Sequence, residues 1–167
     1  MRIDEIRLDS NGVMLRPGRR DGCVRRRAAE MALPAVKRWM GGDTGFRNDK
    51  GIVEELMKHI GGYDGFHIAK SLDERGWGSD SDLVEILDED FICQAEKELV
   101  SQWVKCLGIK SQFPISSQVI FRGETGRVVK HDEALAQYGV QTPDQKDGRH
   151  HVCNAEEIKP VSMEAAV

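Results

Sequence analysis

The hydrophobic periodicity of this 167-residue chain changes once, at residues 110–114, and that change constrains the fold more than any other feature. Before it, apolar residues recur at the three- and four-residue spacing of amphipathic helices. After it, they alternate with a period of two in short segments separated by turns that contain Gly or Pro. Helices followed by strands predict an α+β protein, with a helical domain over 19–108 and a small antiparallel β domain over 114–161.

The first eighteen residues predict a β-hairpin. Asp9-Ser10-Asn11-Gly12 is a strong turn signal between two short apolar segments, because Asn-Gly tolerates the positive φ of tight hairpin turns. Two strands alone are marginally stable, so the hairpin over 1–18 must pack on another element. Residues 162–167 are expected to form a flexible tail.

The helical domain contains a proline that is expected to divide its first helical region. Pro34 interrupts the pattern over 19–40, which predicts two helices with Pro34 in the first turn of the second. Asn48 or Asp49 is expected to cap the next helix, and Asp64 a shorter one. The residues expected to face the core are Val24, Ala28, Met31, Ala32, Ala35, Trp39, Ile52, Val53, Leu56, Ile60, Phe66, Ala69 and Leu72.

The last helical region is expected to begin near Asp82 and to end at Leu107, before Gly108. A Gly76-Trp77-Gly78 break precedes it, and a residue between 79 and 81 is expected to cap it. Its apolar residues recur mostly in steps of four, which drift by about 40° per step around an ideal helix. A bend or a short break is therefore expected near residues 88–90.

The C-terminal segment carries a resemblance to a known fold. It reads SQVIFRGETGRVVKH, then AQYGVQT, then RHHVCNAEEIKPV, with turns expected at 123–126, 142–144 and 147–148. This pattern resembles a small Src-homology or KOW-type barrel, and the resemblance implies a closed antiparallel β-barrel. Barrels of this kind carry many functions, so the resemblance indicates a fold rather than an activity. Its expected core is Val119, Phe121, Val128, Val140, Val152 and Ile158.

The net charge of −4 is unevenly distributed along the chain. Basic residues outnumber acidic ones over 1–50, whereas residues 71–100 carry ten acidic groups against only Arg75 and Lys97. This distribution predicts either two surfaces of opposite charge or two segments that neutralise each other.

The acidic residues of the last helical region are the first candidate site. On a regular helix, Asp82, Glu85, Glu89 and Glu96 fall within an arc of about 60°. Such a surface can mimic nucleic acid or bind the basic groove of a partner, and the alternative is a solvated helix face. Trp77 is either an anchor in a partner pocket or a residue that packs between two helices. The candidate partner-binding residues are Trp77, Asp80, Asp82, Glu85, Asp88, Glu89, Asp90 and Glu96.

The same stretch resembles uncharacterised small proteins of bacteriophages and prophages. The resemblance is carried by DGFHIAKSLDERGW and LVEILD, within residues 63–160. It implies a non-catalytic protein that binds and blocks a nucleic-acid-handling defence complex in the cytoplasm of a bacterial host, as CRISPR inhibitors do.

The basic residues of the first helical region are the second candidate site. They are expected to form two rows, which can contact phosphates in a salt-dependent manner. A nucleic-acid-binding accessory protein that uses these rows and the barrel is therefore the alternative function. The rows can equally pair with the acidic helix of the same chain or of a second copy. The residues are Arg19, Arg20, Arg26, Arg27, Lys37 and Arg38.

No motif in the sequence predicts an enzyme or a cofactor. His151 and Cys153 share one face of a strand, but zinc needs three or four ligands, so Cys153 is expected in the core and no metal is expected. The four cysteines are far apart, which predicts reduced thiols. The glycines over 41–51 do not match a phosphate-binding loop. No apolar run approaches the about 20 residues of a membrane helix, and the N-terminus lacks the apolar core of a signal peptide.

Overall fold

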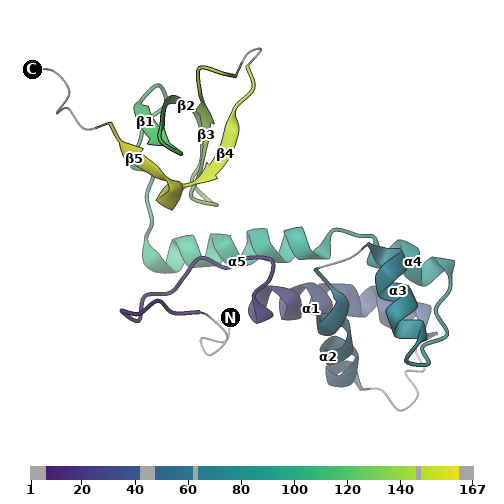
Figure 1. Cartoon of the computed structure of the whole chain (residues 1–167). Coiled ribbons are helices and arrows are strands. Elements are labelled where there is room, and N and C mark those ends of the chain that lie inside the picture. Colours follow the sequence, from purple (N-terminus) through teal and green to yellow (C-terminus); the bar gives the residue numbers. More distant parts are fainter. Residues whose placement is uncertain (1–6, 42–47, 62–63, 146–147, 162–167) are drawn as a thin grey trace, which may run out of the picture. The chain divides into compact units, whose positions relative to one another are not determined.

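The computed structural model confirms the α+β class and describes residues 7–41, 48–61, 64–145 and 148–161 (Figure 1). The chain forms two compact units, residues 1–99 and residues 100–167. The division falls inside a helix, whereas the sequence analysis placed it after residue 108. In the described part of the chain, no helix is both long and apolar enough to cross a membrane.

The first unit is built from helices that bury one face each. They are α1 (Gly22–Trp39), α2 (Asp49–His59), α3 (Gly65–Asp73), α4 (Ser81–Leu87) and the first half of α5 (Phe91–Leu107). The N-caps of α2, α3 and α4 are Asn48, Asp64 and Asp80, all among the predicted capping residues. Each side chain accepts a hydrogen bond from the backbone N–H of the residue three positions later. The core includes Val24, Ala28, Ala32, Val36, Ile52, Leu56, Leu72, Leu83 and Ala95.

The prediction of two helices around Pro34 is wrong, because α1 runs through the proline without a break. Pro34 is exposed, and buried residues on both sides of it, Ala32 and Val36, belong to one continuous apolar stripe. A proline inside a helix removes one backbone hydrogen bond and costs about 3 kcal/mol. The packing of that stripe offsets this cost and keeps the helix continuous.

Of two other predictions about the helical region, one is wrong and one is confirmed. Phe66 was expected in the core, but its exposed fraction is 60%, and Ile68 is buried in its place. The break predicted near residues 88–90 is confirmed, because α4 ends at Leu87 and α5 begins at Phe91.

The N-terminal segment forms the predicted turn, although part of the expected hairpin lies outside the described residues. The Asp9 carboxylate accepts hydrogen bonds from the backbone N–H groups of Asn11 and Val13, and Gly12 has a φ of +77°. A single bridge pairs Leu8 with Met14. The predicted flexible tail also lies outside the described residues.

The second unit holds a five-stranded antiparallel sheet in the order β4-β3-β2-β1-β5. Its strands are β1 (Gln118–Phe121), β2 (Glu124–Asp132), β3 (Gln137–Gln141), β4 (His151–Asn154) and β5 (Ile158–Pro160), with a 3₁₀ turn η2 (Ala155–Glu157) before β5. The Tyr138 hydroxyl accepts hydrogen bonds from the backbone N–H groups of Gln112 and Phe113, which fixes the segment before β1 to the sheet.

The turn between β1 and β2 is shorter than predicted. Phe121 pairs with Glu124, so only Arg122 and Gly123 form the loop, and both have positive φ as a two-residue hairpin loop requires. The remaining residues of the expected turn, 124–126, belong to β2. Gly126 is needed there because a Cβ atom would come within 2.5 Å of the Val140 side chain.

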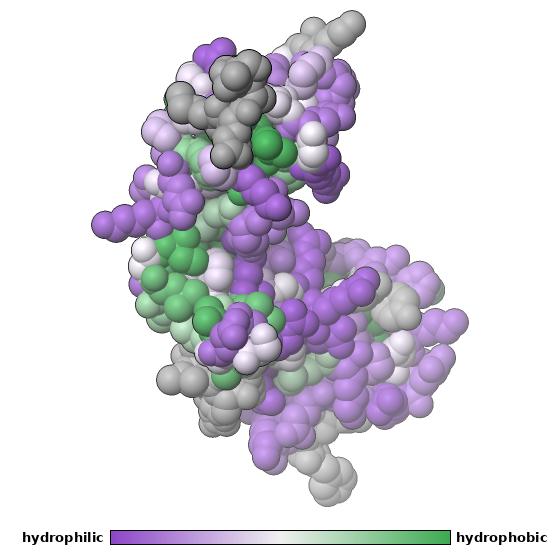
Figure 2. Space-filling view, turned by 60° about the vertical axis from the view of Figure 1, so that its left-hand side comes forward, coloured by the Kyte–Doolittle hydropathy of each residue, from purple (hydrophilic) through white to green (hydrophobic). Residues whose placement is uncertain are grey.

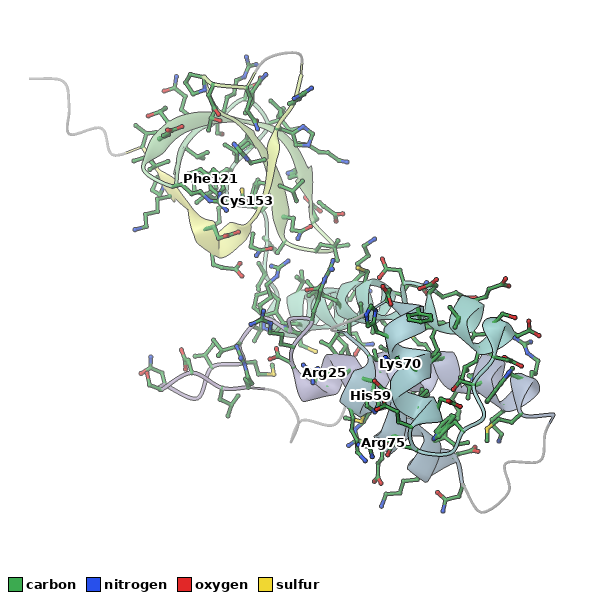
Figure 3. All side chains as sticks on the ribbon, turned by 45° about the vertical axis from the view of Figure 1, so that its right-hand side comes forward. Arg25, His59, Lys70, Arg75, Phe121 and Cys153 are labelled. Carbon is green, nitrogen blue, oxygen red and sulfur yellow. The ribbon has the colours of Figure 1, made fainter. Side chains whose placement is uncertain are left out.

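The core of the sheet contains five of the six predicted residues. Val152 is the exception, with an exposed fraction of 66%, because Cys153 occupies the inward position of β4. Phe121 and Cys153 both point into the interior of this unit (Figure 3). The described strand pairings leave β4 and β5 as the two edges, so closure of the sheet into a barrel stays a prediction.

Candidate acidic surface

The acidic residues at the start of α4 and in the α4–α5 link are partly committed to the fold. Asp80 accepts hydrogen bonds from the Leu83 backbone N–H at 3.0 Å and from the Trp39 indole N–H at 2.7 Å. These two donors stabilise the carboxylate and hold the pKa of Asp80 below its usual value, the Leu83 bond having the larger effect. Asp80 therefore anchors α4 to α1 as well as capping it.

Asp88 and Asp90, in the link between α4 and α5, also bond to backbone groups of the fold. Asp88 Oδ1 accepts a hydrogen bond of 2.6 Å from the backbone N–H of Gly65, the first residue of α3. Asp90 Oδ1 accepts a bond of 3.3 Å from the backbone N–H of Cys93. Hydrogen bonding to the Cys93 side chain is the main reason that the pKa of Asp90 is lowered. Both carboxylates thus fix helix ends.

Glu96 is paired with the basic segment upstream. The Arg19 guanidinium lies 3.0 Å from the Glu96 carboxylate, and this bond raises the pKa of Arg19. In α1, Arg27 lies 2.9 Å from Glu98. Two acidic residues of α5 are therefore neutralised by the basic segment over 19–27, as the pairing alternative predicted. Each such surface ion pair contributes about 0–1 kcal/mol, so its main effect is on the charge of the surface.

Three of the predicted acidic residues are left, namely Asp82, Glu85 and Glu89, and we call them the acidic surface. All three are exposed, and none forms an ion pair with a described Lys, Arg or His side chain. Asp82 accepts a hydrogen bond only from the neighbouring Ser81 hydroxyl at 3.5 Å among the described residues, at the limit of a hydrogen bond. The structure thus divides the seven predicted acidic residues into four whose carboxylates bond backbone groups or distant side chains and three whose carboxylates do not.

The single arc expected for Asp82, Glu85, Glu89 and Glu96 is wrong. That arc requires one regular helix, but α4 ends at Leu87, so Glu89 lies in the link and Glu96 on the next helix. The physical reason is that apolar residues in steps of four move gradually around a regular helix. The chain breaks between α4 and α5, so each helix can turn its own apolar residues toward the core. Only Asp82 and Glu85, three residues apart on α4, keep the predicted helical relation.

Trp77 lies in the core of the helical unit. Its exposed fraction is 8%, and it packs in the cluster that contains Leu72 and Leu83. One edge of it lines an open pocket of about 500 Å³, together with Glu55 and Arg75. Glu55 Oε1 lies 2.9 Å from Arg75 and 3.7 Å from His59, a cluster that joins α2 to the end of α3 (Figure 3). These contacts fit the packing interpretation of Trp77.

The arginine rows are not free as a whole. Arg19 and Arg27 are paired with α5, and Lys37 lies 2.7 Å from Asp49 at the start of α2. Arg26 is half-buried. Arg20 and Arg38 are exposed, with no ion pair to a described acidic residue. The structure therefore pairs three of the six predicted basic residues with α2 and α5, which interrupts the predicted basic rows.

A pocket next to the acidic surface was missed by sequence reasoning. It has a volume of about 400 Å³ and lies where the end of α2, the start of α3 and the α4–α5 link meet. Its lining comes from three separate segments within residues 60–92, so no local pattern could predict it. The apolar part is Ile60, Ile68, Leu87, Phe91 and Ile92, and the acidic part is Asp64, Asp88, Glu89 and Asp90.

Neither histidines nor cysteines assemble a reactive centre in the described part of the chain, where no three His, Cys, Asp or Glu side chains are placed to hold a metal ion. His151 instead lies against the Phe121 ring at 5.5 Å between ring centroids. The Cys153 thiol donates a hydrogen bond to the Tyr138 carbonyl, and burial raises its pKa to about 11. Cys153 is thus a core residue, as the sequence analysis expected.

The surface of the helical unit is largely hydrophilic on the face shown in Figure 2. Comparisons with protein-family models, with curated proteins and with solved structures found no match.

Proposed function

We propose that this chain is a non-catalytic binding protein whose acidic surface binds a basic groove on a partner protein or ribonucleoprotein complex. The observation that supports this proposal is the division among the carboxylates. Asp80, Asp88, Asp90 and Glu96 have partners within the fold, whereas Asp82, Glu85 and Glu89 are exposed without ion pairs among the described residues.

The rigidity of α4 supports binding by this surface. Asp80 caps the start of the helix and bonds to Trp39, and Asp88 at its end bonds to α3. A fixed helix loses little conformational freedom on binding, which favours affinity. Closely spaced carboxylates also attract a basic partner before contact and raise the rate of association.

The proposed partner is a host defence complex that handles nucleic acid, blocked in the manner of a CRISPR inhibitor. This part of the proposal rests on the resemblance of residues 63–160 to phage and prophage proteins, together with the acidic surface. A groove that binds nucleic acid is basic, so it presents the charge that Asp82, Glu85 and Glu89 would complement. Action in the cytoplasm of a bacterial host belongs to the same proposal.

A nucleic-acid-binding accessory protein is the second candidate. Exposed Arg20 and Arg38 favour it, and so does the antiparallel sheet, in which β5 pairs with β1 as closure into a barrel requires. Against it, Arg19, Arg27 and Lys37 are engaged by acidic residues. Tight binding of a short DNA or RNA duplex that weakens steeply with salt would favour this candidate over the first.

Charge reversal of the acidic surface tests the proposal. We expect Asp82→Lys, Glu85→Lys and Glu89→Lys together to abolish capture of a specific partner from a bacterial lysate, because the reversed surface repels a basic groove. The matched control reverses Glu74, Glu124 and Glu133, which are also exposed and change the charge equally. Equal capture by both variants and the unmodified protein, compared by mass spectrometry, would contradict the proposal.

A further inference from the structure

The pocket beside the acidic surface has two chemically different parts. Its apolar part includes Leu87, Phe91 and Ile92, at the end of α4 and the start of α5. Its acidic part combines Asp64, at the start of α3, with the three carboxylates of the α4–α5 link. The volume of about 400 Å³ is within the range of small-ligand sites.

The apolar part favours an occupant with a hydrocarbon portion. Ile68, Leu87 and Phe91 are at least nine-tenths buried core residues, whereas Ile92 is half-buried and has more surface to offer. A bare metal ion or an inorganic ion would gain nothing from such a wall. The described residues also hold no cluster of three ligating side chains suited to a metal ion.

The acidic part favours a cationic head group. Asp64 is bonded to His67, and Asp88 and Asp90 each use one oxygen to bond a backbone N–H group. Glu89 is exposed, and no described residue bonds its side chain, so its carboxylate is available. The occupant that combines an aliphatic stem with a cation is a Lys or Arg side chain. Among these, the planar guanidinium of Arg bonds carboxylates in a bidentate manner.

We propose that this pocket binds an arginine side chain of the partner protein, with the stem against Ile92 and the guanidinium on Glu89. The inference rests on the proposed function, because it names the group that anchors a basic partner to the acidic surface. It adds a specific contact to a general charge attraction. An inserted arginine at the centre of a contact is also a common energetic anchor of protein interfaces.

The test uses the full chain and a short arginine peptide, acetyl-Gly-Arg-Gly-amide, followed by backbone amide NMR shifts. We expect saturable shifts confined to Gly65, Ile68, Glu89, Phe91 and Ile92, and no saturation with the peptide in which citrulline replaces arginine. Glu89→Gln should weaken binding about tenfold, since a charge-assisted bond is lost. Glu74→Gln removes the same charge from an exposed residue outside the pocket and outside the acidic surface, and it should change binding less than twofold.

A second variant separates shape from charge. Ile92→Trp leaves the carboxylates in place but fills the apolar part, and it should also weaken binding about tenfold while thermal unfolding shows a folded protein. Equal effects of Glu74→Gln and Glu89→Gln, equal binding of the citrulline peptide, or no binding would overturn the pocket proposal. The acidic-surface proposal would still stand in each case if the triple charge reversal abolished partner capture.

Discussion

Gly65 is the residue on which the position of the acidic surface depends most directly. A Cβ atom there would lie 2.4 Å from the Val84 carbonyl oxygen and 2.6 Å from the Asp88 backbone nitrogen. Both atoms belong to the backbone at the end of α4, so neither can rotate away. Only glycine lets the start of α3 approach α4 this closely and donate its N–H to Asp88.

We expect Gly65→Ala to destabilise the protein by about 2–4 kcal/mol, because α3 must move away from α4 and the Asp88 bond is lost. Urea unfolding followed by circular dichroism measures the change. Gly51→Ala in α2 is the control, since the nearest atom to its Cβ is 3.5 Å away and α2 is helical at that position. It should raise stability by about 0.5–1 kcal/mol. A neutral Gly65→Ala would show that the two helices are not held at this distance.

Single residues also mark where sequence reasoning stops. Phe66 and Val152 were assigned to the core from periodicity, yet both are exposed, because the neighbouring Ile68 and Cys153 occupy the inward positions. In short elements the period fits two phases almost equally well, and tertiary packing selects one. The need for glycine at position 65 could not be predicted either, since it arises from contact with a residue 23 positions later.

At the scale of single elements, capping residues were the best predicted features. Asp64 was identified, and Asn48 and Asp80 were among the two or three candidates at their helix starts, because an N-cap depends on local sequence alone. The continuity of α1 was not predicted, because the packing that overrides Pro34 involves other helices. The pocket was missed for the same reason, as it exists only where three segments meet.

The exposed Pro34 gives a prediction for α1. We expect Pro34→Ala to stabilise the protein by about 1–2 kcal/mol, because alanine restores the missing backbone N–H and has the highest helix propensity. The gain is smaller than the full helix penalty of proline, since alanine also makes the unfolded chain more flexible. Chemical denaturation with urea measures it, and a loss of stability would mean that the proline ring itself contributes to the packing of α1.

The cap of α4 gives a prediction for acid stability. The pKa of Asp80 is lowered in the folded protein, so its contribution is present above the unfolded value of 3.8 and is lost as the pH falls through the folded value. Asp80→Asn keeps an N-cap acceptor without a titrating group. We expect the variant to lose stability less steeply than the unmodified protein below about pH 4. The measurement is the thermal unfolding temperature of both proteins between about pH 2 and about pH 5. If that temperature falls equally steeply with pH in the variant and in the unmodified protein, this role of Asp80 is contradicted.

At the scale of the whole molecule, the sequence predicted where basic and acidic residues are concentrated but not which of them pair. A basic segment and an acidic segment were visible, but their partners were not. The structure shows that Arg19 and Arg27 neutralise Glu96 and Glu98, while the acidic surface on α4 and the link has no such neighbour among the described residues. Ion pairs between distant segments follow from tertiary packing, which no periodicity encodes.

This division predicts how association depends on salt. We expect the association rate with the captured partner to fall about tenfold between roughly 50 and 300 mM salt, because added ions screen the attraction to the acidic surface. The dissociation rate should change much less. Surface plasmon resonance measures both rates. The comparison is the variant with Asp82, Glu85 and Glu89 changed to lysine. If its association rate depends on salt as strongly as that of the unmodified protein, the charges that attract the partner lie outside the acidic surface.

The ion pairs of Arg19 and Arg27 with α5 have a consequence for how the negative charge of the surface can be changed. Because Arg19 and Arg27 each cover one carboxylate, loss of either arginine would uncover another negative group without altering any acidic residue. The size of the negative patch is therefore adjustable from two positions that lie outside the acidic surface. A single substitution at either arginine would enlarge the patch while the sequence of α4 stays the same.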